Sequence, residues 1–69
     1  MKPAAAVILN YLLRHYPRFV SVPELIRECS QSDVRKRVSE LARERQGFEI
    51  EKERNGRFVA YRAVERSAA

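Results

Sequence analysis

The stretch Ser30–Gln46 reads SQSDVRKRVSELARERQ, and the interpretation of the whole chain depends on it. Val34, Val38 and Leu41 are spaced i, i+4 and i+7, which predicts a helix with one narrow apolar seam. The opposite side of this helix carries only small and basic residues, namely Ser32, Lys36, Ser39 and Arg43, flanked by Arg35 and Arg37. The segment is therefore predicted to pack along its seam and to present a basic face to solvent.

The start of this helix is marked by two alternative N-caps. Ser30 and Asp33 are spaced like a loose capping box, whereas Ser32 is itself a suitable N-cap residue. Either choice leaves only a tight turn between this helix and the one before it, which is the connection that a helix-turn-helix motif needs. The two alternatives place the start of this helix two residues apart.

The basic face of this helix allows two interpretations. A helix fits the DNA major groove, where Arg and Lys reach guanine acceptors or phosphates and short serines allow close approach. The alternative is the solvated face of an ordinary amphipathic helix, and the helix by itself does not decide between them. Under the first interpretation the groove contacts are Ser32, Arg35, Lys36, Ser39 and Arg43.

After Gly47 the sequence changes from a helical period to the alternation that is typical of β-strands. In Phe48–Arg54 apolar or basic residues alternate strictly with glutamates, so that the two apolar residues share one face. The dipeptide Asn55-Gly56 is a strong hairpin signal, and a second β-favouring run, Arg57–Val64, follows it. A C-terminal β-hairpin is predicted.

The expected hairpin register follows from counting outward from the turn. With Asn55 and Gly56 as the two loop residues, Arg54 opposes Arg57, and Glu49 opposes Arg62 on the outer face. The inner face of the hairpin then consists of Phe48, Ile50, Val59, Tyr61 and Ala63.

The hairpin tip is basic, which suits contact with a phosphate backbone or a minor groove. The tip residues expected to make such contacts are Lys52, Arg54, Asn55, Gly56 and Arg57. Glu49, Glu51 and Glu53 form an acidic row on the outer face, which is expected to point away from phosphates. Phe58 lies on the same outer face, where an exposed aromatic side chain is a candidate protein contact.

The N-terminal part of the chain predicts a helix over Ala4–Tyr16, with Pro3 in its first turn and Pro17 ending it. Its broad apolar face consists of Ala5, Ile8, Leu9, Leu12, Leu13 and Tyr16. Val7, Tyr11 and His15 form a second strip. This strip is expected to lie under the hairpin or the chain end; otherwise it is a dimer contact, with Tyr11 as a second candidate for protein binding.

Between these parts lies a short β-favouring run, Phe19–Val22, expected at the edge of a small sheet. Ser21-Val22-Pro23-Glu24 matches the capping box, in which the serine hydroxyl and the glutamate carboxylate each accept a backbone N–H. A short helix is predicted from Val22 or Pro23 to about Cys29. Leu25 and Cys29 form its buried side, with Ile26 beside them.

Composition narrows the function further. The 69 residues predict one domain over 1–66 with a frayed tail at 67–69, and a net charge of 14 − 9 = +5 suits a polyanionic partner. No catalytic, cofactor, metal or small-molecule site is evident, and an enzyme is not expected. The single cysteine forms no internal disulfide, and no membrane span or signal peptide is recognised, so a cytoplasmic protein is expected.

The order helix, short strand, capped short helix, tight turn, basic helix and NG hairpin resembles that of a winged helix-turn-helix domain. The segments DVRKRVSELARERQGFEI and NGRFVAYRAV look like those of small winged-helix proteins of bacteria and their prophages. The resemblance implies an α+β fold with three helices, a short strand and a hairpin wing. It assigns Val34, Val38 and Leu41 to packing. The acidic row on the outer face of the hairpin departs from the family pattern.

The resemblance implies sequence-specific binding of double-stranded DNA by a transcriptional regulator or by a phage-type repressor or excisionase-like factor. A homodimer or a cooperative array on DNA is expected, because one small module offers a modest interface. The alternative is a winged-helix module that binds another protein without reading DNA. RNA binding is less favoured, since the surface aromatics that stack on bases are missing.

Overall fold

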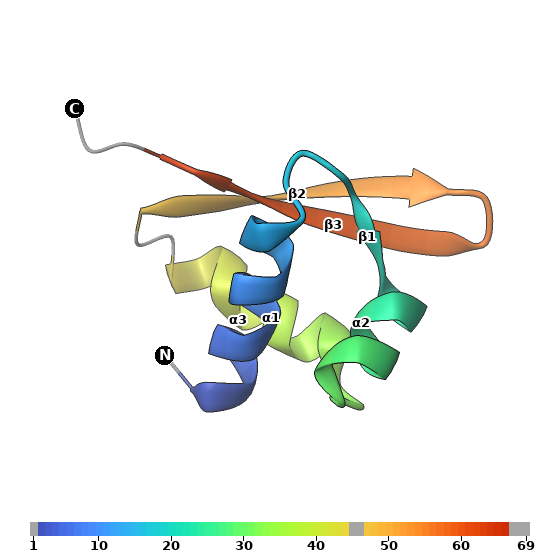
Figure 1. The fold of residues 1–69 in the computed structure, drawn as a ribbon, viewed down its shortest axis with the longest axis horizontal. Coiled ribbons are helices and arrows are strands. Elements are labelled where there is room, and N and C mark those ends of the chain that lie inside the picture. Colours follow the sequence, from blue (N-terminus) through green and yellow to red (C-terminus); the bar gives the residue numbers. More distant parts are fainter. Residues whose placement is uncertain (1, 45–46, 67–69) are drawn as a thin grey trace.

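Three helices lie on one face of a three-stranded antiparallel sheet (Figure 1). The computed structural model describes residues 2–44 and 47–66. Its elements are α1 (Pro3–Arg14), β1 (Val20–Ser21), α2 (Val22–Cys29), α3 (Val34–Glu44), β2 (Phe48–Asn55) and β3 (Phe58–Glu65). The strand order is β1-β3-β2, so the last strand is central and the short β1 lies at an edge. The predicted α+β class is confirmed, whereas the tail predicted at 67–69 lies outside the described residues.

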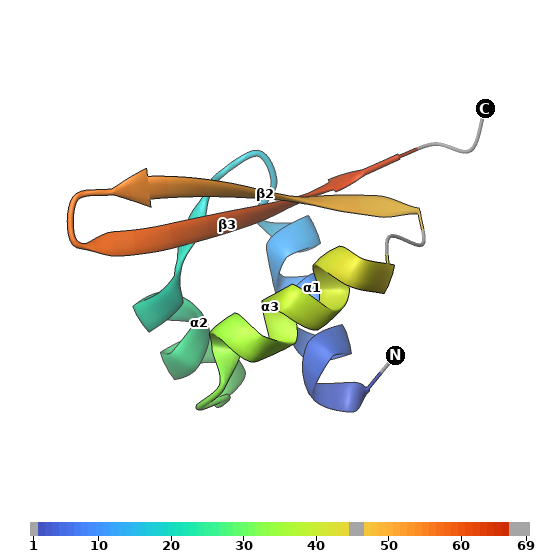
Figure 2. The ribbon, with the colours of Figure 1, turned by 180° about the vertical axis from the view of Figure 1, so that it is seen from behind.

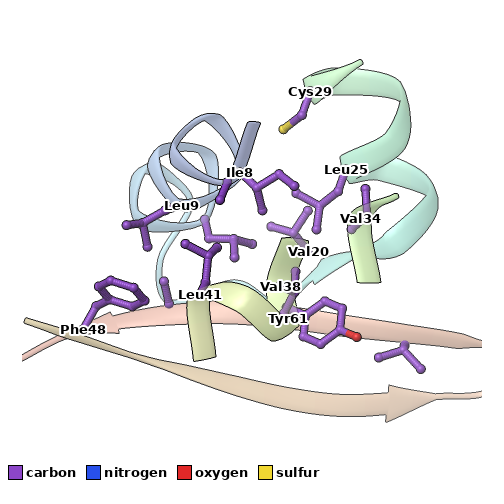
Figure 3. Close-up of a cluster of buried hydrophobic side chains, with 14 residues drawn as sticks. Ile8, Leu9, Val20, Leu25, Cys29, Val34, Val38, Leu41, Phe48 and Tyr61 are labelled. Carbon is purple, nitrogen blue, oxygen red and sulfur yellow. The ribbon is translucent and has the colours of Figure 1, made fainter. Parts of the chain in front are cut away.

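The apolar seam of α3 is buried as predicted. Val34, Val38 and Leu41 are 1%, 3% and 0% exposed, and they contact both the other helices and the sheet (Figure 3). The rest of the core comes from every other element of the fold. Its members are Ala5, Ile8, Leu9, Leu12, Val20, Leu25, Cys29, Phe48, Val59, Tyr61 and Ala63.

Helix α1 is shorter than predicted and ends at Arg14. Tyr16 precedes Pro17, and the residue before a proline avoids the helical conformation because its backbone collides with the proline ring. The Tyr16 side chain therefore leaves the apolar face on which it was predicted and is 50% exposed. Leu13 is only partly buried, so the core face of α1 consists of Ala5, Ile8, Leu9 and Leu12.

The N-cap residue of α3 is neither of the two predicted residues. Ser30 ends α2 in the left-handed conformation, with φ 53° and ψ 38°. The first bond of α3 runs from the N–H of Arg37 to the carbonyl of Asp33 at 3.0 Å, which puts Asp33 at the N-cap position. The N-caps predicted at Ser30 and Ser32 are therefore wrong, because Ser30 already terminates the preceding helix. Residues 30–33 form a four-residue turn.

The hairpin forms, but its register is shifted by two residues from the predicted one. Asn55 pairs with Phe58, so the loop consists of Gly56 and Arg57, and Arg54 pairs with Val59. Tight two-residue hairpin loops need a positive φ at their first residue, which glycine adopts without strain. Gly56 occupies this position with a φ of +62°. This loop lets Asn55 join the ladder.

A two-residue shift exchanges cross-strand partners without exchanging faces. The inner face is therefore as predicted, with Phe48, Val59, Tyr61 and Ala63 buried and Ile50 partly buried. The predicted pair of Glu49 with Arg62 is wrong. Arg62 instead pairs with Glu51, and Glu49 accepts a hydrogen bond from Arg66 at 2.7 Å.

The outer face of the sheet is partly covered by the loop that joins α1 to β1. The guanidinium of Arg62 lies 4.5 Å from the centre of the Phe19 ring and donates a hydrogen bond to the carbonyl of Pro17 at 3.2 Å. Arg62 belongs to β3, and its ion pair with Glu51 connects it to β2. Arg62 thus fastens this loop to the hairpin, a contact between residues 45 positions apart in the chain.

Helices α1 and α2 are joined by a polar cluster around Glu24. The Tyr11 hydroxyl donates to this carboxylate at 2.6 Å, and Arg18 donates to both of its oxygens at 3.0 and 2.8 Å. The Ser21 hydroxyl accepts the N–H of Glu24 as the capping box predicts, but the Glu24 carboxylate binds Tyr11 and Arg18. The bonds from Arg18 and then Tyr11 lower the pKa of Glu24 to about 2.

The second strip of α1 is thus partly occupied by α2, which the sequence did not predict. Tyr11 is half-buried against Glu24, and its ring lies 4.3 Å from the ring of His15, measured between centres. Val7, the third member of that strip, is 46% exposed.

We expect Ser30→Gly to raise the free energy of unfolding by up to about 1 kcal/mol, because glycine adopts the left-handed conformation without strain. Chemical denaturation at pH 7 measures the change. Ser32→Gly is the matched control, since Ser30 is the only non-glycine residue with positive φ among residues 2–44 and 47–66. Equal effects of the two substitutions would contradict the assigned turn.

The stability of the protein is expected to fall between about pH 4.5 and pH 2. The pKa of Glu24 is lower when the chain is folded, so its stabilisation is present above the usual value of 4.5 and is lost as the pH falls toward about 2. Glu24→Gln should reduce the free energy of unfolding at pH 7, on the order of 1 kcal/mol after solvent screening, and flatten its decline in acid. Urea titrations across this pH range test both effects.

Glu28→Gln, on the exposed side of the same helix, provides the control for this substitution. It removes an equal charge and leaves the Tyr11–Glu24–Arg18 contacts in place. The same pH dependence in Glu24→Gln and in the unmodified protein would exclude Glu24 as its source.

Candidate nucleic-acid interface

The side of α3 opposite its buried seam is an exposed basic face. At about 100° per residue, Lys36, Ser39 and Arg43 fall within about 60° of arc, and Arg35 lies at the edge of this face. All five residues predicted to contact a groove are exposed: Ser32, Arg35, Lys36, Ser39 and Arg43. Ser32 belongs to the turn before the helix rather than to its first turn.

The cations of this face make no close contact with an acidic side chain in the described part of the chain. Within residues 2–44 and 47–66, Arg35, Lys36 and Arg43 make no ion pair or side-chain hydrogen bond. Arg37, at the flank of the face, instead donates to Glu40 at 2.8 and 3.3 Å, which lowers the pKa of that carboxyl.

The hairpin brings a second group of cations to one end of this face. Strand β2 follows α3 in the chain. The hairpin tip extends beyond the helices at the end where α2 and the start of α3 lie (Figures 1 and 2). Lys52 and Arg54 follow Phe48 and Ile50 on the face of the sheet that the helices cover. Lys52, Arg54 and Arg57 are exposed and have no ion-pair partner in the described part of the chain.

The remaining two residues predicted at the tip differ in position. Gly56 lies in the loop, whereas the backbone of Asn55 belongs to β2 and pairs with Phe58. The tip therefore offers its cations from the end of β2 and from the loop itself.

The sheet separates these cations from the acidic row. Glu49, Glu51 and Glu53 lie on the opposite face of β2, as the alternation predicts. Glu49 and Glu51 are paired with Arg66 and Arg62, which leaves Glu53 as the unpaired acid of the row among the described residues. A polyanion that contacts α3 and the inner side of the hairpin tip would meet neither the row nor its partners.

A shallow groove of about 360 Å³ separates α2 from the first turn of α3. Val22 and Ile26 form its apolar side, and Arg35 and Lys36 lie along its rim. Ile26 is 42% exposed there, although the sequence placed it only beside the buried side of α2. Sequence periodicity gives no sign of this groove, because its shape depends on how the two helices pack.

Of the two residues predicted to contact protein, Tyr11 lies on α1, and Phe58 follows Arg57 at the hairpin tip but lies on the outer face of the sheet. Tyr11 is half-buried and its hydroxyl is bound to Glu24, while Phe58 is 53% exposed on the outer face of the sheet.

Comparisons of the chain with protein-family models, with curated proteins and with solved structures gave no match. In the described part of the chain, no helix has the length and apolar character to cross a membrane. Across the same residues, no three His, Cys, Asp or Glu side chains gather into a potential metal site.

The unpaired cations of α3 should be dispensable for folding. Lys36→Gln and Arg43→Gln are expected to leave Tm nearly unchanged, because neither side chain makes a hydrogen bond or a close ion pair in the described part of the chain and Lys36 acts on Glu40 only at longer range. Arg37→Gln should lower Tm by a few degrees at most, since it breaks the hydrogen bonds to Glu40. Thermal unfolding followed by circular dichroism compares the three variants, and a larger loss in Lys36→Gln than in Arg37→Gln would contradict the assigned contacts.

Proposed function

We propose that this protein is a winged helix-turn-helix protein that binds double-stranded DNA in a sequence-specific manner. The observation that carries the proposal is the placement of two sets of unpaired cations, on α3 and on the hairpin tip, on the side of the sheet away from the acidic row. In this proposal α3 enters the major groove, and the β2–β3 hairpin acts as the wing.

The order and pairing of the elements support the winged-helix assignment. A four-residue turn joins α2 to α3, which is the length typical of a helix-turn-helix. The hairpin follows α3 directly, and β1 adds a short edge strand to it.

The side chains on α3 suit groove contact. Arg and Lys donate to the N7 and O6 acceptors of guanine or to phosphates, whereas Ser39 is short enough to let the helix backbone approach the bases. Lys36 and Arg43 are separated by two turns of the helix and would follow the groove over successive base pairs. The seam holds the helix in place while these side chains remain free to bind.

The hairpin tip would contribute affinity rather than sequence readout. Lys52 and Arg54 at the end of β2, and Arg57 in the two-residue loop, form a narrow tip that can approach the phosphate backbone or the minor groove. Because one domain of this size provides a modest interface, we expect it to bind as a homodimer or as a cooperative array. A transcriptional regulator or a phage-type repressor or excisionase-like factor would use DNA in this way.

Binding to duplex DNA should weaken steeply with salt. About five phosphate contacts predict a slope near −4.5 in a plot of log binding constant against log salt concentration. Fluorescence anisotropy with a labelled random-sequence duplex measures the non-specific part, and selection from a random DNA pool identifies the preferred site. A flat salt dependence or no enriched sequence would contradict the proposal.

Charge reversal on α3 should strongly weaken this binding. We expect Lys36→Glu and Arg43→Glu each to weaken it at least about tenfold, since each replaces a phosphate or base contact by repulsion. The control is Arg14→Glu, an equal charge change on α1. Helix α1 lies behind α3 in Figure 2 and packs on its apolar seam, which is opposite the basic face. Equal losses in all three variants would indicate attraction by net charge alone.

A further inference from the structure

The outer face of the sheet carries a pocket that the proposed DNA interface does not use. The pocket measures about 420 Å³ and lies between the loop that joins α1 to β1 and the tip half of the hairpin. Its apolar surfaces are Pro17, Phe19, Phe58 and Ala60. Its polar rim consists of Arg18, Ser21, Glu24 and Glu53.

Next to this pocket, the outer face of the sheet already binds an arginine side chain of the protein itself. There, the guanidinium of Arg62 stacks over the Phe19 ring and pairs with Glu51, its cross-strand partner. An arginine between an aromatic ring and a carboxylate gains cation–π attraction, an ion pair and burial of its aliphatic stem.

One cross-strand pair nearer the tip, the carboxylate recurs but the arginine does not, and the residue of β1 beside this pair is Ser21. Glu53 stands opposite Ala60, where Glu51 stands opposite Arg62. Ala60 is buried and lines the pocket, and its small apolar side chain leaves Glu53 without a cross-strand cation. Phe58 follows on the same face and remains 53% exposed.

The charges of the pocket favour a cation. Arg18 is held by two hydrogen bonds to Glu24, so these two rim charges offset each other. The carboxylate of Glu53 has no ion pair or side-chain hydrogen bond within residues 2–44 and 47–66. The pocket thus combines an uncompensated negative charge with exposed aromatic surface in a chain whose net charge is +5.

We propose that this pocket receives an arginine side chain of a different protein, stacked on Phe58 and paired with Glu53. Because the pocket and the basic face of α3 lie on opposite sides of the sheet, such a partner can bind while α3 is occupied. The site would connect the protein, bound to DNA, to a second protein with an exposed arginine.

The test uses the full chain and a defined probe, the capped tripeptide acetyl-Gly-Arg-Gly-amide. Amide chemical shifts should change saturably at Glu53, Phe58 and Ala60, with weak affinity. The matching peptide with citrulline, which is nearly isosteric and uncharged, should cause no saturable change. Equal responses to the two peptides, or changes centred on other acidic residues, would overturn the proposal.

Three variants examine the individual contributions. Glu53→Gln and Phe58→Leu should each weaken binding, on the order of three- to tenfold. Glu49→Gln, in the same acidic row but paired with Arg66, should leave it unchanged. Ala60→Arg should block the peptide by supplying the missing arginine internally, and unaltered peptide binding by a folded Ala60→Arg protein would refute the assigned pocket.

Sedimentation of the protein alone separates the two sources of arginine. Glu53→Gln is expected to leave the sedimentation of the protein unchanged, whether the protein is a monomer or a homodimer. Self-association that Glu53→Gln abolishes would assign the arginine to a second copy of this chain and overturn the choice of a different protein. Neither measurement contains DNA, so the result is independent of the proposed DNA binding.

Discussion

Burial of the narrow seam of α3 is the constraint on which the rest of the structure depends. Val34, Val38 and Leu41 are almost fully buried, and each such side chain contributes about 1.5–3 kcal/mol relative to its exposed state. Because the helix has no second apolar strip, rotation about its axis would bury arginine or lysine without a partner. The seam therefore decides which side chains of α3 face outward, and these are the basic ones.

The sheet completes this separation of charge. Side chains alternate between its faces, so the acids of β2 point to one side and the cations of its tip end to the other. On the outer side, Arg62 joins the hairpin to the loop before β1 and neutralises one acid of the row. The basic face of α3 and the pocket at Glu53 thus belong to opposite sides of one small domain.

Features that depend on periodicity were predictable from the sequence. The helical spacing predicted the buried seam and the exposed face of α3, and the alternation of the hairpin predicted its inner and outer faces. The register was not predictable, because Asn55-Gly56 and Gly56-Arg57 are both acceptable two-residue loops and differ by a shift that keeps every face. The N-cap was missed because Ser30 adopts a left-handed conformation that favours glycine.

Long-range contacts were beyond what local patterns can show. The Glu24 carboxylate has a capping-box position, yet Tyr11 and Arg18 bind it because α1 and the following loop pack beside α2. The groove beside Ile26 and the pocket over Ala60 likewise arise only when separate elements come together. The sequence indicated the cations of the candidate interface, but not the surfaces beside them.

DNA binding through α3 is tested most directly by a map of amide chemical shifts during titration of the protein with a DNA duplex from the selection. We expect the shifts to concentrate at Lys36, Ser39, Arg43 and the hairpin tip, while Glu49, Glu51 and Glu53 stay unchanged. Shifts confined to the outer face of the sheet, with α3 unaffected, would contradict it.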